Sequence, residues 1–122
     1  MELTTEVSTA GEAAKLVLVP DRKIIQADGT DLSFVTVKVV DKNGVVVPRA
    51  DNLVNFTLSG PGFVAGVDNG NEISHESFKA SHRKAFHGLA MAIIQSKGSA
   101  GAITLKATAD GLAPASVTIA AR

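Results

Sequence analysis

The feature that most constrains this sequence is a series of short apolar runs with a two-residue period, each bounded by glycine, asparagine, aspartate or proline. Within residues 32–40, the valines at positions 35, 37 and 39 alternate with Thr36 and Lys38, which is typical of a strand with one buried face. The same alternation recurs in residues 54–59 and 103–108. Short runs of this kind, separated by turn residues at intervals of about 8 to 12 positions, indicate an all-β sandwich or barrel.

The pattern predicts about seven strands and no helix. In chain order, the expected strands cover residues 15–19 with a short continuation at 24–25, then 32–40, 45–47, 54–59, 63–67, 89–95, 103–108 and 116–119. We therefore expect an immunoglobulin-like antiparallel two-sheet sandwich, with a small barrel as the alternative architecture. Its core should combine valine, leucine and isoleucine with Phe34 and Phe56. Phe34 is out of phase with its valine neighbours, so either a bulge reverses the faces there or Leu32 and Phe34 cover the other side of the sheet.

Length and composition favour a single folded domain. The chain has 122 residues, of which 45% are hydrophobic and 20% charged, and this balance excludes intrinsic disorder as the main state. Residues 1–13 are small, polar and aperiodic, so we expect a linker or disordered terminus there and the sandwich domain in residues 14–122. The start of the chain, with Glu2 and Glu6, differs from a signal peptide, and we expect the sequence to be a piece of a longer protein. No apolar run approaches the ~20 residues that a membrane-spanning helix needs.

Charge and residue types exclude several classes of function. The 12 lysine and arginine residues balance the 12 aspartate and glutamate residues, whereas a nucleic-acid-binding domain normally has a basic excess. Because the sequence has no cysteine, disulfides and cysteine-bound metals are excluded. The lack of tryptophan and tyrosine makes direct glycan binding unfavourable, because carbohydrate-binding modules usually stack sugars on those rings.

Two clusters contain metal-ligand chemistry, and for both we favour a simpler interpretation. Residues 68–72 (Asp-Asn-Gly-Asn-Glu) supply the oxygen atoms that calcium prefers, but these residue types are also those of an ordinary tight turn. The other cluster consists of His75, Glu76, His82 and His87. Its spacing matches no zinc motif, so we expect surface histidines. The sequence therefore predicts no metal site and no cofactor.

The carboxylates do not predict catalysis by this domain alone. A glycosidase needs two carboxyl groups roughly 5 to 10 Å apart across a sugar-sized cleft, and a single small sandwich rarely builds such a cleft. Asp68, Glu72 and Glu76 lie in an expected turn region. No serine occupies a nucleophile-elbow sequence. We therefore expect that this domain is not itself an enzyme.

Residues 68–88 form a long segment with little periodicity, in which basic residues are interleaved with phenylalanine. The candidate docking residues in it are Phe78, Lys79, His82, Arg83, Lys84, Phe86 and His87. One interpretation is a docking loop that meets an acidic partner surface and uses the two phenylalanines as apolar anchors. The other is a solvated loop whose phenylalanines fold back onto the core. Long loops in small sandwiches are usually functional or held by a neighbour.

Two stretches resemble known bacterial domains. Residues 27–48 resemble the opening strands of bacterial immunoglobulin-like domains in general, including those of invasin-like adhesins. A second resemblance, to the C-terminal immunoglobulin-like domain of family 2 glycoside hydrolases, rests on residues 55–96 and 100–112, with the segments NFTLSGPGFVAGVDNG, SHESFKASHRKAFHGLAMAIIQS and AGAITLKATADGL. These hydrolases are the bacterial β-galactosidase-like enzymes common in gut Bacteroides. The resemblance extends over residues 13–119.

The second resemblance implies a non-catalytic accessory domain of an enzyme that degrades carbohydrates. In that family, two glutamates of a (β/α)8 barrel catalyse retaining hydrolysis, and Glu72 and Glu76 match no catalytic motif of the family. The implied partners are other domains of the same enzyme or a neighbouring subunit, and the implied location is periplasmic or secreted. Two alternatives stay open, namely an adhesin-type immunoglobulin-like surface module and a weak glycan-binding module that uses polar loop residues.

Overall fold

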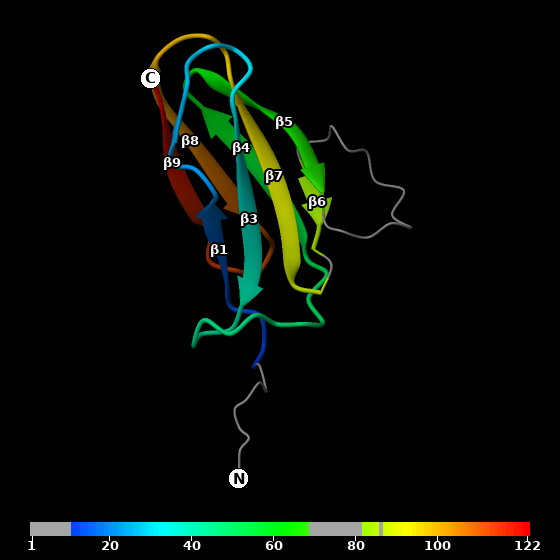
Figure 1. The fold of residues 1–122 in the computed structure, drawn as a ribbon. Helices are drawn as coiled ribbons and strands as arrows, with labels where there is room; N and C mark the ends of the chain where they lie inside the picture. The colour runs from blue at the N-terminus through cyan, green and yellow to red at the C-terminus, as the bar shows by residue number, and fades with distance from the viewer. Residues whose placement is uncertain (1–10, 69–81, 86) are drawn as a thin grey trace.

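The computed structural model describes residues 11–68, 82–85 and 87–122, and within them every regular element is a β-strand (Figure 1). The strands of this described part are β1 (Lys15–Pro20), β2 (Ile24–Ile25), β3 (Leu32–Val40), β4 (Leu53–Ser59), β5 (Gly62–Asp68), β6 (His82–Lys84), β7 (Leu89–Ser96), β8 (Gly101–Thr108) and β9 (Ala115–Ala121). Over the same residues, no helix is present that could cross a membrane.

The strands form two sheets that pack face to face. The front sheet has the strand order β1-β3-β7-β5 and is antiparallel throughout. The back sheet has the order β2-β9-β8-β4-β6, in which β2 runs parallel to β9 and the other neighbours are antiparallel. Figure 1 shows β1, β3 and β7 in front of β8 and β9. The predicted two-sheet sandwich is confirmed, with the difference that the back sheet is mixed.

The strand pattern differs from the expectation at two places. Residues 45–47 were expected to form a strand, but they contribute an isolated bridge between Val46 and Val40 as the chain turns back after β3. Conversely, β6 forms where the sequence shows no alternation. Arg83, the residue of β6 whose side chain is described, is buried but not apolar, so the two-residue apolar period that marks the other strands is missing there.

The core lies between the sheets and is built mainly from branched aliphatic side chains. In β3, Val35, Val37 and Val39 are fully buried, because successive residues of a strand point to opposite faces and these three share the inner face. The main contributions of the back sheet come from Val54, Phe56, Ile103, Leu105 and Ile119.

Phe34 does not belong to this core, although the sequence predicted it there together with Phe56. Its side chain is 38% exposed, whereas Phe56 is buried. The pairing of β3 with β7 runs without a register shift, so no bulge reverses the faces and Leu32 and Phe34 lie on the outer side of the front sheet. The bulge of this sheet lies in β5, between Val64 and Gly66.

Strand β7 carries apolar side chains on both of its faces, and its inner face holds the fully buried Ile94 as well as small residues. Ala90 and Ala92 are buried, whereas Leu89, Met91 and Ile93 lie on the outer face. Both sets are apolar, so the alternation of this strand predicts its extent but not its buried side. The pairing with β3 determines it, because Ala92 stands opposite a buried valine and Ile93 opposite the exposed phenylalanine.

Candidate functional site

The predicted docking loop is only partly described. Phe78, Lys79 and Phe86 lie outside the described residues. The backbone of His82 and Lys84 belongs to β6, while their side chains are outside the described part. Strand β6 pairs antiparallel with β4 and forms one edge of the back sheet. The docking role of the loop therefore stays a prediction, and the structure adds the placement of two of its residues.

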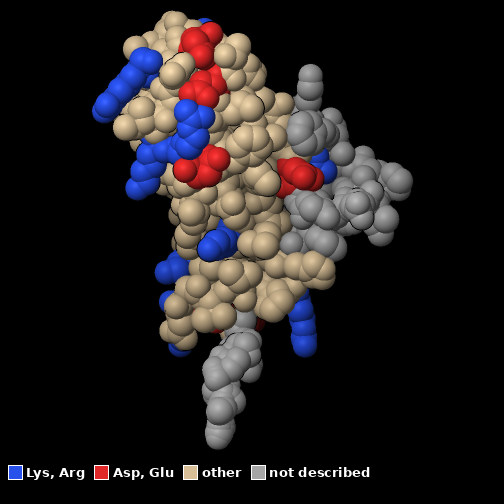
Figure 2. All heavy atoms as spheres, in the orientation of Figure 1, with Lys and Arg blue, Asp and Glu red and all other residues tan. Residues whose placement is uncertain are grey.

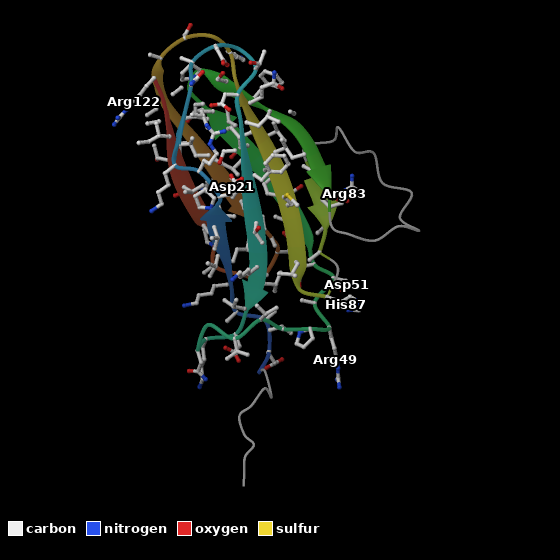
Figure 3. All side chains as sticks on the ribbon, viewed as in Figure 1. Asp21, Arg49, Asp51, Arg83, His87 and Arg122 are labelled. Carbon is white, nitrogen blue, oxygen red and sulfur yellow. The ribbon has the colours of Figure 1, made fainter. Side chains whose placement is uncertain are left out.

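Arg83 is buried rather than presented to a partner. The register pairs it with Val54, a fully buried residue. Directly opposite residues share one face of a sheet, so both side chains point toward the front sheet. Arg83 is only 3% exposed, and its Nη2 donates a hydrogen bond of 3.0 Å to the carbonyl oxygen of Val67 in β5. Since β5 and β6 are edges of different sheets, this bond joins the two sheets at one side of the sandwich (Figure 3). The structure thus gives Arg83 an internal contact, while its predicted docking contact stays a prediction.

His87 is exposed and lies in a fixed turn between β6 and β7. Its φ of 54° falls in the left-handed region, and that of Gly88 is 79°. A Cβ on Gly88 would lie 2.5 Å from the carbonyl oxygen of Val47, so the turn requires glycine there. Backbone hydrogen bonds from residues 85 and 88 tie the turn to the segment that contains Asp51 (Figure 3). Among the candidate docking residues whose side chains are described, His87 is the accessible one.

Asp41 follows β3, and its side chain is bound to the backbone groups around it. Its buried carboxylate accepts hydrogen bonds from the N–H groups of Gly11, Asn43 and Val45 at 2.9, 2.8 and 3.0 Å. These bonds, that from Gly11 foremost, hold the pKa of Asp41 below its ordinary value. A hollow of about 640 Å³ lies between residues 11–14 and 41–43. The carboxylate at this hollow therefore serves to fix the turn.

A second group of carboxylates surrounds Arg22 in the segment between β1 and β3. Both terminal nitrogens of Arg22 contact the two carboxylate oxygens of Asp31 at 2.7 Å, and this pair holds the pKa of Asp31 well below its usual range. The backbone N–H groups of Thr30 and Asp31 likewise lower the pKa of Asp28. A general acid of glycoside hydrolysis needs a raised pKa, so these groups are suited to structure and not to proton donation.

The two clusters with metal-ligand chemistry are mostly outside the described part of the chain. Asp68 ends β5, but residues 69–72, His75 and Glu76 are not described, nor is the side chain of His82. Over residues 11–68, 82–85 and 87–122, no group of three or more His, Cys, Asp or Glu is arranged to hold a metal ion. The turn and surface-histidine interpretations of these clusters therefore stay predictions.

Comparisons with known proteins agree on one family. The family model of the glycoside hydrolase family 2 C-terminal domain 5 matches residues 16–118. The β-galactosidase BoGH2A of Bacteroides ovatus is 53% identical over 116 residues, which are 95% of this chain and 14% of that protein. The crystal structure of a glycosyl hydrolase family 2 member from Bacteroides cellulosilyticus superposes with a TM-score of 0.93 at 38% identity, covering 95% of this chain and 15% of that one.

A more distant likeness concerns the fold alone. The C-terminal 282-residue fragment of intimin, in complex with the intimin-binding domain of its translocated receptor, has a TM-score of 0.55 at 16% identity, over 90% of this chain and 33% of that one. The chain spans only 14% and 15% of the two glycoside hydrolase relatives. The resemblance inferred from the sequence is confirmed by the family model and by these relatives, and the chain belongs to the glycoside hydrolase family 2 C-terminal domain 5 family.

Proposed function

We propose that this chain is a non-catalytic accessory domain of a β-galactosidase-like glycoside hydrolase that takes part in carbohydrate degradation. The observation that carries the proposal is the 53% identity over 116 residues to the β-galactosidase of Bacteroides ovatus. The matched residues make up 14% of that enzyme. The family that matches residues 16–118 is by its description a C-terminal domain. A domain of this size within a much longer hydrolase is suited to support a catalytic body elsewhere in the chain.

Three of the described carboxylates support the non-catalytic part of the proposal. Asp28, Asp31 and Asp41 accept hydrogen bonds from backbone groups or from Arg22, and the pKa of each is lowered. A retaining glycosidase requires one carboxyl group with a raised pKa and a second about 5 Å away. Groups that are fixed as acceptors in turns do not meet that requirement.

The proposal extends to partners and location. The domain packs on other domains of its own polypeptide or on a neighbouring subunit, without a role in nucleic-acid or direct glycan binding, and the enzyme is periplasmic or secreted. The candidate docking loop of residues 78–87 belongs to this proposal. Within it, His87 offers an exposed side chain, while Arg83 links β6 to β5.

The test compares the full-length polypeptide with a version that lacks residues 14–122. We expect the full-length protein to hydrolyse a β-galactoside and the shortened one to denature at lower temperature. Per active site, counted by titration with a covalent inhibitor, the pH profile of kcat should stay the same, because the acid and base lie outside the deleted part. The control is residues 14–122 alone, which should give no hydrolysis. Hydrolysis by these residues alone, or none by the full-length protein, would contradict the proposal.

A further inference from the structure

We propose that the outer face of the front sheet is a surface on which this domain packs against the rest of its own polypeptide, in addition to the candidate docking loop. This inference deepens the proposed function and rests on it, because the occupant is another domain of the same enzyme. We call this surface the outer apolar face. Its apolar residues are Val17, Val19, Leu32, Phe34, Phe63, Leu89, Met91 and Ile93, and the polar residues Thr36, Lys38, Asp68 and Gln95 lie among them.

The apolar side chains of the outer apolar face lie in neighbouring rows across the strands, with polar residues between some of them. Phe34 of β3 stands opposite Ile93 of β7, and Gly66 of β5 continues the same row. In the neighbouring row, Leu32 of β3 and Phe63 of β5 flank a glutamine of β7. Residues directly opposite on adjacent strands have Cβ atoms about 4.5–5.5 Å apart. In the other two rows, Thr36 stands between Val19 and Met91, and Lys38 between Val17 and Leu89. The apolar groups therefore make one surface that a few polar side chains interrupt.

This surface is open to solvent in the domain as described. Val19, Phe34, Phe63 and Leu89 are exposed by 43%, 38%, 39% and 40%. Figure 2 views the molecule from this side, where many of the charged side chains lie toward the ends and edges but a basic side chain also lies in the area of β3. The register places Lys38 there, between Val17 and Leu89. A contiguous apolar surface bordered by charges marks a contact site.

The outer face of the back sheet provides a comparison within the same molecule. Its outward residues are mostly polar and include Asn55, Thr57, Ser59, Thr104, Lys106, Thr108, Ser116 and Thr118. Two exposed apolar residues also lie on this face, Ile24 in the two-residue strand β2 and Leu53 at the start of β4. An antiparallel sheet with one side in water normally places apolar residues inward and polar residues outward, and the central part of the back sheet follows this rule. The front sheet departs from it, since β7 places Leu89, Met91 and Ile93 on its outer face. A sheet with many apolar residues on both faces is expected to have other protein packed against both of them.

The rest of the polypeptide is the occupant that the observations favour. Relatives are much longer than this chain, which covers 14% and 15% of two of them. The segment leading into β1 is fixed at the end of β3, because Gly11 donates to Asp41 and Ala14 donates to the carbonyl oxygen of Val40. A neighbour on the same polypeptide meets this domain at an effective concentration on the order of millimolar.

The chemistry of the outer apolar face also fits a protein surface better than a sugar. Glycan platforms usually consist of tryptophan or tyrosine rings with polar groups around them, and the sequence contains neither residue. Aliphatic side chains and phenylalanine instead match the apolar centre of a contact between domains, which within one chain typically buries about 600–1,500 Å².

The test uses a matched pair of cysteine variants in the full-length polypeptide. Thr36→Cys places a thiol in the middle of the outer apolar face, beside Val19 and Met91. Thr104→Cys places the same group on the outer face of the back sheet, and both threonines are half-buried in this domain. The domain has no cysteine of its own, so a maleimide label on it can be assigned by mass spectrometry. We expect the thiol at position 36 to react at least about tenfold more slowly than that at 104, because it must wait for the domains to open.

The controls separate this inference from the proposed function. In urea the two thiols should react at equal rates. Equal rates in the native full-length protein overturn the inference, and if hydrolysis of a β-galactoside is retained the proposed function stands. If the slow reaction at position 36 disappears on dilution, the face is covered by a second copy of the protein. If the reaction becomes slow only after a galactoside is added, the face is covered by a sugar. Either result also overturns the inference. A native sequence without glycosidase activity contradicts the proposed function, whatever the labelling rates are.

Discussion

Replacing Arg83 by methionine tests whether the guanidinium holds the two sheets together. Methionine keeps much of the apolar stem but removes the donor to the carbonyl oxygen of Val67, which belongs to a fully buried residue. A hydrogen bond from a charged donor contributes about 1.5–3 kcal/mol to stability. We therefore expect Arg83→Met to lower the free energy of unfolding by about 2 kcal/mol, which corresponds to a fall in Tm of roughly 6–12 °C in a domain of this size.

The assay is urea unfolding followed by circular dichroism, since the chain has no tryptophan or tyrosine to report by fluorescence. Arg49→Met is the matched control, because Arg49 is exposed in the loop before β4 and its loss should change stability by less than about 0.5 kcal/mol. Arg83→Glu should be the most damaging variant, with a loss of about 3–5 kcal/mol, because it leaves a buried charge without compensation. If Arg83→Met and Arg49→Met unfold at the same urea concentration, Arg83 is not the internal link described here.

Two further perturbations follow from the backbone and from the carboxylates. Gly60→Ala should cost about 2–5 kcal/mol, because its φ of 96° disfavours any other residue and a Cβ would lie 2.1 Å from the carbonyl oxygen of Ala102. Gly44→Ala, at a similar φ of 85° but with open space around it, should cost only about 1–2 kcal/mol, and equal losses in urea unfolding would refute the steric argument. Hydrogen bonds from Arg22 place the folded-state pKa of Asp31 below its ordinary value of 3.8, so the stability that this pair adds is present above that value and is lost as the pH falls below it. Asp31→Asn should therefore flatten the dependence of Tm on pH below pH 4, and an unchanged slope there would contradict this assignment.

The sandwich could be predicted from the sequence because most of its strands have one apolar and one polar side. In β3, β4 and β8 the alternation gives both the extent of the strand and its buried face, and the structure follows it. Turn residues then separate these strands clearly. The resemblance to family 2 glycoside hydrolases was equally readable, because long segments keep their order and spacing.

The sequence-based predictions of burial fail where contacts between strands, and not the local pattern, decide which side of a strand is buried. Phe34 is as apolar as its valine neighbours, and only the unbroken register with β7 shows that it points outward. Arg83 stands within a basic run, which suggested a solvated or docking side chain, yet pairing with Val54 turns it inward. No local pattern distinguishes an arginine that donates to a distant carbonyl from one that lies in water. The outer apolar face was missed for the same reason, since both sides of β7 are apolar.

The parallel pairing of β2 with β9 has a consequence for the way this domain is made in the cell. Ile25 in β2 is buried, and its strand neighbour is supplied from Ala115–Ala121, almost at the other end of the chain. In the back sheet, β9 lies between β2 and β8. When the ribosome has synthesised the chain only as far as β8, both β2 and β8 therefore lack this neighbouring strand. Until β9 leaves the exit tunnel, the nascent domain keeps an open strand edge and an uncovered isoleucine, which are the features that chaperones bind.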